Sequence, residues 1–140
     1  MPSPDPSLDL WVGRTARRSF EITAELVAAF AGLSGDRSPI HVDDEAARRR
    51  GFRLRVAHGA LQAALVSAVL GMDLPGACGT LQSLEMQFRK PCYPGDRVEV
   101  EVRVAEAHDS VRTLLLRIRI TNQDRELVSS GKAQSLIEVP

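Results

Sequence analysis

The sequence predicts an α+β fold in which one antiparallel sheet wraps around a long central helix. The last sixty residues alternate between apolar and polar side chains, as the strands of a half-buried sheet do. The stretch Ala60–Leu70 is instead apolar on almost every side, which is typical of a helix inside a protein. The length of 140 residues suits a single domain.

The segment before residue 34 predicts one strand and one amphipathic helix. Arg14–Ile22 alternates weakly between polar and apolar residues, which favours a strand. Thr23 is a favourable N-cap, so we expect a helix over Ala24–Leu33. The apolar residues expected on its buried face recur at helical spacing, namely Leu26, Val27, Phe30 and Leu33.

A loop and two further helices follow. Ser34–Pro39 is made of turn-forming residues and is expected to be a loop. Asp43 can cap a short helix that runs through Arg50. The third helix is the apolar stretch Ala60–Leu70, which has no wide polar face, so we expect the rest of the protein to enclose it.

The second half of the chain predicts four strands. Leu84–Phe88, Val98–Val104 and Leu114–Ile120 place apolar residues at every second position, and Leu127–Val139 completes the set. Strands with one apolar face must cover something, and the central helix is the obvious filling. This is the hot-dog arrangement. One thin sheet cannot bury a helix on all sides, so the chain is expected to dimerise.

Composition restricts the class of protein. Eighteen basic and eighteen acidic residues give a net charge of zero, whereas a general nucleic-acid-binding protein is normally basic. Cys78 and Cys92 are the only cysteines, which excludes a disulfide framework and indicates a reducing, cytoplasmic compartment. No apolar stretch is long enough for a membrane span. Residues 1–9 lack the features of a signal peptide, so we expect a flexible tail before a single domain over 10–140.

The pattern with the most chemical content lies between Gly35 and His41. Asp36 and His41 are five residues apart, and Pro39 restricts the backbone between them. A loop of this kind can direct a carboxylate and an imidazole at one water molecule, so that one group takes a proton and the other supplies one. An unperturbed histidine pKa of ~6.5 suits that task. Each residue also has an ordinary alternative role, Asp36 as a brace of the turn and His41 as a structural histidine.

The start of the central helix offers a second group. A helix N-terminus presents free backbone N–H groups and the positive end of the helix dipole. Gly59 carries no side chain that would block them, so an anion or oxyanion site is expected there. A carbonyl bound at Gly59, opposite a water held by Asp36 and His41, is the arrangement required to add water across a conjugated double bond.

Four segments together resemble the MaoC-like (R)-specific enoyl-CoA hydratases, and the resemblance covers nearly the whole chain from about Leu10. The segments are Gly32–His41, Ala57–Gly59 with Leu61, Phe88–Pro91 and Gly95–Val98. The resemblance implies a hot-dog homodimer that reversibly hydrates trans-2-enoyl-CoA to (R)-3-hydroxyacyl-CoA. It implies no metal or redox cofactor, since coenzyme A is part of the substrate. It also implies that Asp36 and His41 form the catalytic dyad and that the Gly59 N–H polarises the thioester carbonyl.

Three further residues are expected to contribute to the substrate site. Ser67 matches a supporting serine of bacterial members of the family. Ser38 stands where many hydratases carry asparagine, and its shorter side chain is expected to alter the water network. His58 precedes Gly59, and it could serve as a second base or shape the start of the helix.

Several alternatives remain open at this point. The thioester could be carried by an acyl carrier protein or belong to a polyketide or branched acyl chain. The chain could also be a non-catalytic, thioester-binding subunit of a heteromer, or form an oligomer higher than a dimer. Asp36, His41, Asp43 and His58 have the ligand types of a metal site, but no supporting shell is visible in the sequence, so no metal is predicted.

The arginines of the short helix have two interpretations. Arg48–Arg50, with Arg53 and Arg55, could meet the phosphates of coenzyme A. A solvated helix face is the commoner role for such a run, and Glu45 is spaced to pair with Arg49.

Overall fold

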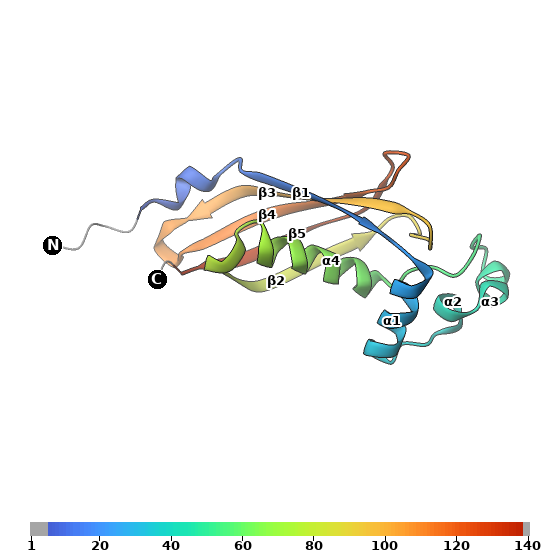
Figure 1. Cartoon of the computed structure of the whole chain (residues 1–140). Coiled ribbons are helices and arrows are strands. Elements are labelled where there is room, and N and C mark those ends of the chain that lie inside the picture. The colour runs from blue at the N-terminus through green and yellow to red at the C-terminus, as the bar shows by residue number, and fades with distance from the viewer. Residues whose placement is uncertain (1–5, 139–140) are drawn as a thin grey trace.

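The structure, a computed structural model, describes residues 6–138 and contains a five-stranded sheet with one long helix lying along it (Figure 1). The strands are β1 (Thr15–Glu21), β2 (Gly79–Phe88), β3 (Arg97–His108), β4 (Thr113–Thr121) and β5 (Leu127–Ile137). Neighbouring strands are antiparallel and follow the order β1-β3-β4-β5-β2, so β1 and β2 are the edges.

The helices are α1 (Ala24–Ser34), α2 (Pro39–Val42), α3 (Asp44–Arg49) and α4 (Gly59–Met72). Three short 3-10 turns complete the set, η1 (Leu8–Trp11), η2 (Gly76–Cys78) and η3 (Asp109–Val111). Within residues 6–138, no helix is both long and apolar enough to cross a bilayer. The predicted α+β class and the predicted order of elements are confirmed, except that α2 was expected to be loop and β2 begins five residues before the expected strand.

The face of the sheet that meets α4 is apolar because β3 and β4 carry aliphatic side chains at every second position. These side chains are at most 1% exposed, and they are Val98, Val100, Val102, Val104, Leu114, Leu116, Ile118 and Ile120. Helix α4 packs Val66 and Val69, both fully buried, into the same core. Because each such side chain contributes about 1.5–3 kcal/mol when buried, the sheet fixes where α4 lies and therefore where its N-terminus ends.

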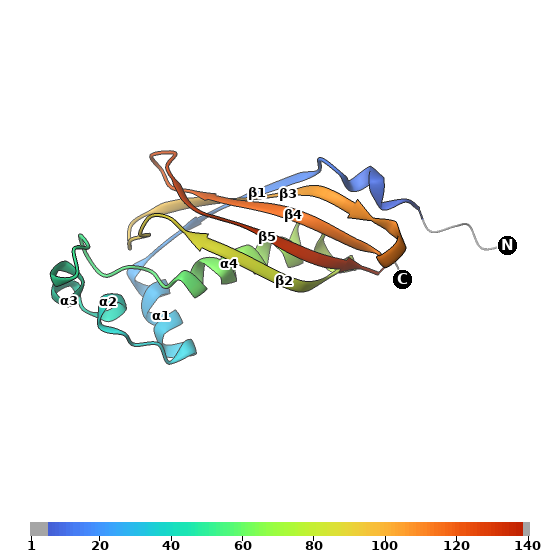
Figure 2. The same cartoon turned by 180° about the vertical axis from the view of Figure 1, so that it is seen from behind.

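The opposite side of α4 is open in a single chain. Ala60, Ala64, Ser67 and Gly71, which recur every three or four residues, are exposed. One sheet therefore covers only one side of α4, as expected for a single copy of the chain. Figure 2 shows the same layering from behind, with the sheet in front of α4 and its outer face free of helices.

Helix α1 begins as predicted, with the Thr23 hydroxyl accepting the Leu26 N–H at 3.0 Å. Its buried face was predicted only in part. Val27 and Ala31, four residues apart, are buried, whereas Leu33 is 84% exposed. Leu33 lies two residues beyond Ala31, which places it on nearly the opposite side of the helix.

The N-terminal segment also differs from the prediction. Residues 1–5 of the expected tail lie outside the described residues. Leu8 is buried, and the Asp109 carboxylate accepts its N–H at 2.7 Å and the Ser7 hydroxyl at 2.8 Å. Within residues 6–138, the first helical turn therefore begins at Leu8, two residues before the expected start of the domain.

The packing of β4 predicts the effect of removing one side chain from the core. Ile120→Ala should lower the free energy of unfolding by about 2–5 kcal/mol, because Ile120 is fully buried and a cavity remains. Urea denaturation at a fixed protein concentration measures this loss. Leu10→Ala, at a position 75% exposed, is the control and should change the free energy by less than about 0.5 kcal/mol. Equal effects of the two substitutions would contradict the packing described here.

Candidate active site

The candidate site lies at the end of the molecule where α1, α2 and α3 gather beside the first turn of α4 (Figure 1). Helix α1 ends at Gly35, whose φ of +79° is left-handed and would strain any residue with a side chain. The Ser34 hydroxyl then accepts the Asp36 N–H at 3.1 Å. The chain is therefore turned sharply and held at the point where Asp36 leaves the helix.

Asp36 is held by the residue that was expected to contact substrate. Its Oδ1 accepts the Ser38 N–H at 3.1 Å and the Ser38 hydroxyl at 2.5 Å. These two hydrogen bonds hold the pKa of the Asp36 carboxyl below its usual value, and the bond from the hydroxyl contributes most. His41 and His58 lower this pKa further by smaller amounts. Asp36 is therefore a carboxylate at neutral pH, with one oxygen already occupied.

His41 lies on α2, a single helical turn that begins at Pro39, and not on the loop that the sequence predicted. Proline suits the first helical position because it has no N–H to leave unsatisfied. His41 Nδ1 lies 2.7 Å from the Val56 carbonyl oxygen. Since a carbonyl can only accept, Nδ1 carries the proton, and in neutral His41 the lone pair is on Nε2.

The free atoms of these two residues face one another. His41 Nε2 and Asp36 Oδ2 are 3.9 Å apart, which is too long for a direct hydrogen bond. One water at about 2.8 Å from each atom fits this separation. Asp36 is about half exposed and His41 largely buried, so such a water would lie where the pocket meets solvent.

His58 connects this pair to α4. It is only 2% exposed, and its Nε2 donates to the Asp36 carbonyl oxygen at 2.9 Å. Its ring stacks on His41 at 3.9 Å between centroids, and Phe30 packs on it at 5.0 Å with a tilt of 60°. Within the described part of the chain, His58 Nδ1 is buried without a hydrogen-bond partner. His58 thus contacts both predicted catalytic residues, Asp36 at its backbone and His41 at its ring face.

Gly59 follows His58 and is the first residue of α4. The N–H groups of Gly59 and Ala60 make no hydrogen bond within residues 6–138, as expected for a first helical turn. Gly59 lines a cleft of about 350 Å³ together with Val56, Phe88 and Arg89. A Cβ at position 59 would lie 2.9 Å from the Phe88 ring, so only glycine leaves this approach open.

Ser67 is the predicted site residue that the structure does not bring to the others. It is exposed, on the open side of α4. It follows His58 by nine residues, or about 13 Å along a helix. Within one chain, Ser67 therefore does not meet Asp36 or His41.

Two supporting residues were not predicted from the sequence. Ser34 holds the Asp36 N–H, and its own hydroxyl donates to the Phe30 carbonyl at 2.8 Å. Val56 orients His41 through its carbonyl and donates its N–H to Ile40 at 2.9 Å. A serine just before a glycine at a helix end is a recognisable turn signal, but a backbone carbonyl fifteen residues away leaves no trace in the sequence.

The same cluster has the ligand types of a metal site. One ligand atom from each of Asp36, His41 and His58 lies within 4.8 Å of the others. The two imidazole rings are stacked with planes that differ by only 19°, so their lone pairs lie in separate, nearly parallel planes and do not converge on one ion. His58 Nε2 also carries a proton for the Asp36 carbonyl. This geometry suits a bound water better than a tetrahedral metal ion.

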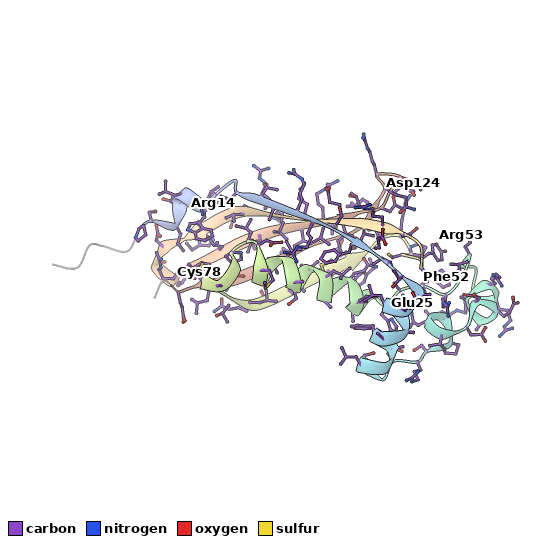
Figure 3. All side chains as sticks on the ribbon, in the orientation of Figure 1. Arg14, Glu25, Phe52, Arg53, Cys78 and Asp124 are labelled. Carbon is purple, nitrogen blue, oxygen red and sulfur yellow. The ribbon has the colours of Figure 1, made fainter. Side chains whose placement is uncertain are left out.

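The arginines near the site are mostly engaged by neighbours. Glu45 pairs with Arg48 at 2.5 Å and not with Arg49, and Arg55 lies 3.7 Å from Asp44. Arg53, labelled beside Phe52 in Figure 3, lies over the Tyr93 ring at 4.6 Å.

The two cysteines differ in place, because Cys92 is among the residues that line the Gly59 cleft and Cys78 is not. Cys78 lies beyond the far end of α4, opposite α1–α3 (Figure 3). Burial, with a smaller contribution from Asp96, raises the pKa of the Cys92 thiol to about 12. Cys92 is therefore protonated and unreactive at neutral pH.

Comparison with known proteins places this geometry in a family. The model of the MaoC-like domain matches residues 12–122. The chain belongs to the MaoC-like family. It is 42% identical over 132 residues to a 3-hydroxybutyryl-CoA dehydratase of Methylorubrum extorquens, covering 94% of this chain and 82% of the relative. It is 37% identical over 124 residues to an (R)-specific enoyl-CoA hydratase of Aeromonas caviae, covering 89% of this chain and 92% of the relative.

Solved structures agree with the family assignment. The (R)-hydratase of Aeromonas caviae involved in PHA biosynthesis superimposes with a TM-score of 0.86 at 35% identity, covering 91% of this chain and 96% of that one. The unliganded R-hydratase PhaJ1 of Pseudomonas aeruginosa superimposes with a TM-score of 0.85 at 32% identity, covering 92% of this chain and 83% of that one. These similarities confirm the predicted hot-dog fold. Hydration and dehydration are one reaction in two directions, so the prediction of a hydro-lyase is also confirmed.

The bonds from Ser38 to Asp36 predict a change in proton affinity. Because Ser38 stabilises the ionised carboxyl, Ser38→Ala should raise the pKa of Asp36 toward its usual value. As a solution is acidified, the variant should therefore protonate Asp36 at higher pH than the parent protein. Carboxyl-carbon NMR titration measures the shift. Ser19→Ala, at an exposed position on β1, is the control, and an identical Asp36 titration in all three proteins would show that Ser38 does not stabilise the carboxylate.

Proposed function

We propose that this MaoC-like protein is an (R)-specific enoyl-CoA hydratase, which reversibly adds water to trans-2-enoyl-CoA to give (R)-3-hydroxyacyl-CoA. The observation that carries the proposal is the 3.9 Å separation of Asp36 Oδ2 and His41 Nε2. The other polar atom of each side chain is occupied, by Ser38 and by the Val56 carbonyl. The names of the relatives, which are hydratases and dehydratases of acyl thioesters, support the same reaction.

In the proposed step, a water held between Asp36 and His41 adds its oxygen to C3 of the enoyl chain while the dyad takes its proton. The C2–C3 electron pair moves toward the thioester carbonyl, whose oxygen becomes negative. The free N–H of Gly59, at the positive end of α4, stabilises that charge. The same dyad returns a proton to C2 on the same face, so addition is syn. No metal or redox cofactor takes part in this scheme.

We propose a positioning role for two of the residues expected to contact substrate. Ser38 keeps Asp36 ionised and turns Oδ2 toward His41. His58 holds the Asp36 backbone and stacks on one face of the His41 ring. Both act through the dyad and do not need to touch the acyl chain.

We further propose a homodimer in which a second copy covers the open side of α4. The uncovered residues of that side are small, and Met72 at its end is 73% exposed. Strand β2 is a sheet edge within the chain and offers unpaired backbone groups beside the helix. Because the chain carries no net charge, two copies meet without overall repulsion. We place this dimer in the cytoplasm on the basis of its two free cysteines.

The dyad is tested by removing either member. His41→Ala and Asp36→Ala should each lower kcat by about two to four orders of magnitude, the usual contribution of a general acid–base group. The measurement is the loss of conjugated absorbance of crotonyl-CoA, repeated over a series of acyl lengths. Thermal melting checks that the variants remain folded.

The outcomes separate the open alternatives. Near-full activity of a folded His41→Ala or Asp36→Ala variant would refute the dyad. Binding of crotonyl-CoA without any change in absorbance would favour a non-catalytic subunit. A carrier-protein thioester of the same acyl chain, assayed in parallel, separates a coenzyme A substrate from a protein-bound one.

The positioning role of His58 is tested by two substitutions. The side-chain amide N–H of glutamine can take the place of Nε2–H, so His58→Gln should retain the bond to Asp36 and stay within a few-fold of the parent kcat. His58→Leu removes the donor and should lower kcat about tenfold with KM changed less than about twofold. Steady-state kinetics measures both constants.

His108 provides the matched control for His58. It is exposed on β3, paired with Glu106, and His108→Leu should leave kcat and KM unchanged. If His58→Gln and His58→Leu were equally impaired, or if His58→Leu raised KM alone, His58 would be a packing or substrate-binding residue and not a positioning residue.

A further inference from the structure

The outer face of the sheet, on the side away from α4, contains a hollow of about 410 Å³ over β2, β4 and β5. Four basic side chains and two neutral polar ones line it, Arg89, Arg117, Arg119, Lys132, Gln87 and Ser130. Among the described residues that line it, Glu85 carries the one carboxylate, which lies 3.6 Å from Lys132. The hollow is therefore strongly positive in a protein whose net charge is zero.

The strand register places like charges together. Arg117 lies directly opposite Lys132 on one side and Arg103 on the other. Directly opposed like charges destabilise an antiparallel pair. No carboxylate in residues 6–138 comes within ion-pair distance of Arg117 or Arg119. Glu101 lies opposite Arg119, but its carboxylate is bonded to Arg17 at 2.9 Å. Folding alone does not account for this arrangement.

Arg89 is fixed without being neutralised. Its Nε donates to the Ser130 hydroxyl at 3.1 Å, and one terminal nitrogen donates to the Gln87 side-chain oxygen at 3.1 Å. Both acceptors are uncharged, so the guanidinium keeps its full charge in a set orientation. A planar, oriented guanidinium with further arginines alongside is the arrangement that binds phosphate oxygens with two hydrogen bonds at once.

We propose that this hollow binds a phosphate or diphosphate group. Its volume of about 410 Å³ suits a small phosphoanion better than a protein surface. Arg89 also lines the cleft of Gly59 and Phe88, so the two sites meet at one residue. The group could therefore belong to the substrate, since coenzyme A joins a diphosphate to the thioester, and this source rests on the proposed function. A free nucleotide or pyrophosphate is the other source of the same chemistry.

Binding is tested with pyrophosphate alone, by isothermal titration calorimetry at low salt. The parent chain should bind it, and Arg117→Gln/Arg119→Gln should bind about tenfold more weakly or not at all. Arg14→Gln/Arg125→Gln removes the same charge from exposed positions outside the hollow and should stay within about twofold of the parent. Failure of the parent to bind, or equal weakening in both double variants, would overturn the proposal.

Thermal melting provides a second readout that needs no turnover. In phosphate-free buffer, Arg117→Gln/Arg119→Gln should melt at or above the temperature of the parent, because it removes opposed like charges. Pyrophosphate should raise the Tm of the parent and of the control, but not that of the variant. The proposed site would be contradicted if the variant melted well below the parent without pyrophosphate. It would also be contradicted if pyrophosphate raised the Tm of the variant as much as that of the parent.

Kinetics then identifies the source of the phosphate. If it is the substrate's own, Arg117→Gln/Arg119→Gln should raise KM for crotonyl-CoA about tenfold at unchanged kcat. KM for crotonyl-pantetheine, which lacks the phosphates, should then stay the same. If the source is a free phosphoanion, both KM values should be unchanged while the pyrophosphate site is still lost. Absence of turnover in the parent would refute the proposed function and leave the titration valid.

Discussion

The hydrogen bond from His58 to the Asp36 carbonyl joins the two parts of this molecule. On one side of the bond is α4, whose position is fixed by the apolar faces of β3 and β4. On the other is the segment from Gly35 to α3, which has few buried residues of its own. This hydrogen bond and the stacking of the His41 ring on His58 attach the segment from Gly35 to α3 firmly to α4. Packing of its own few buried residues would hold that segment only weakly. This connection places the Asp36 backbone beside the first turn of α4, and the Val56 carbonyl then orients His41.

Within the site, the structural hydrogen bonds of each side chain determine which of its polar atoms is left for chemistry. Asp36 Oδ1 accepts the hydrogen bond from the Ser38 hydroxyl, and His41 Nδ1 donates to the Val56 carbonyl. The remaining Oδ2 and Nε2 face one another with room for one water. The tautomer of His41 and the ionisation of Asp36 are thus set by the backbone and by Ser38 before any substrate arrives. Such preorganisation lowers the cost of reaching the transition state, because little has to rearrange during the reaction.

The sequence was informative where local chemistry decides structure. The alternation of β3 and β4, the Thr23 cap and the apolar character of α4 predicted the layers and their order. The spacing of Asp36 and His41 around Pro39 predicted a facing pair, and the structure brings them together. Leu33 was misplaced because helical spacing alone does not say which side of α1 meets the sheet.

Other features depend on contacts between distant segments. The support of His41 by Val56 and the contact of Phe88 with Gly59 join residues fifteen and twenty-nine positions apart. Ser67 shows the limit in another way. Its residue type matches the resemblance, but the open side of α4 places it away from the dyad of its own chain. No pattern along one chain reveals what covers a helix face that the chain itself leaves open.

Net charge illustrates why composition and surface must be considered separately. Eighteen basic and eighteen acidic residues argue against a protein that coats nucleic acid. Strand register nevertheless sorts the charges locally. Glu101 pairs with Arg17, and no carboxylate in the described part of the chain pairs with Arg117 or Arg119. Because period-two alternation sends every second residue of β4 to the outer face, the regularity that builds the core also gathers these cations. A protein can therefore have no net charge and still present a localised anion site on one face of its sheet.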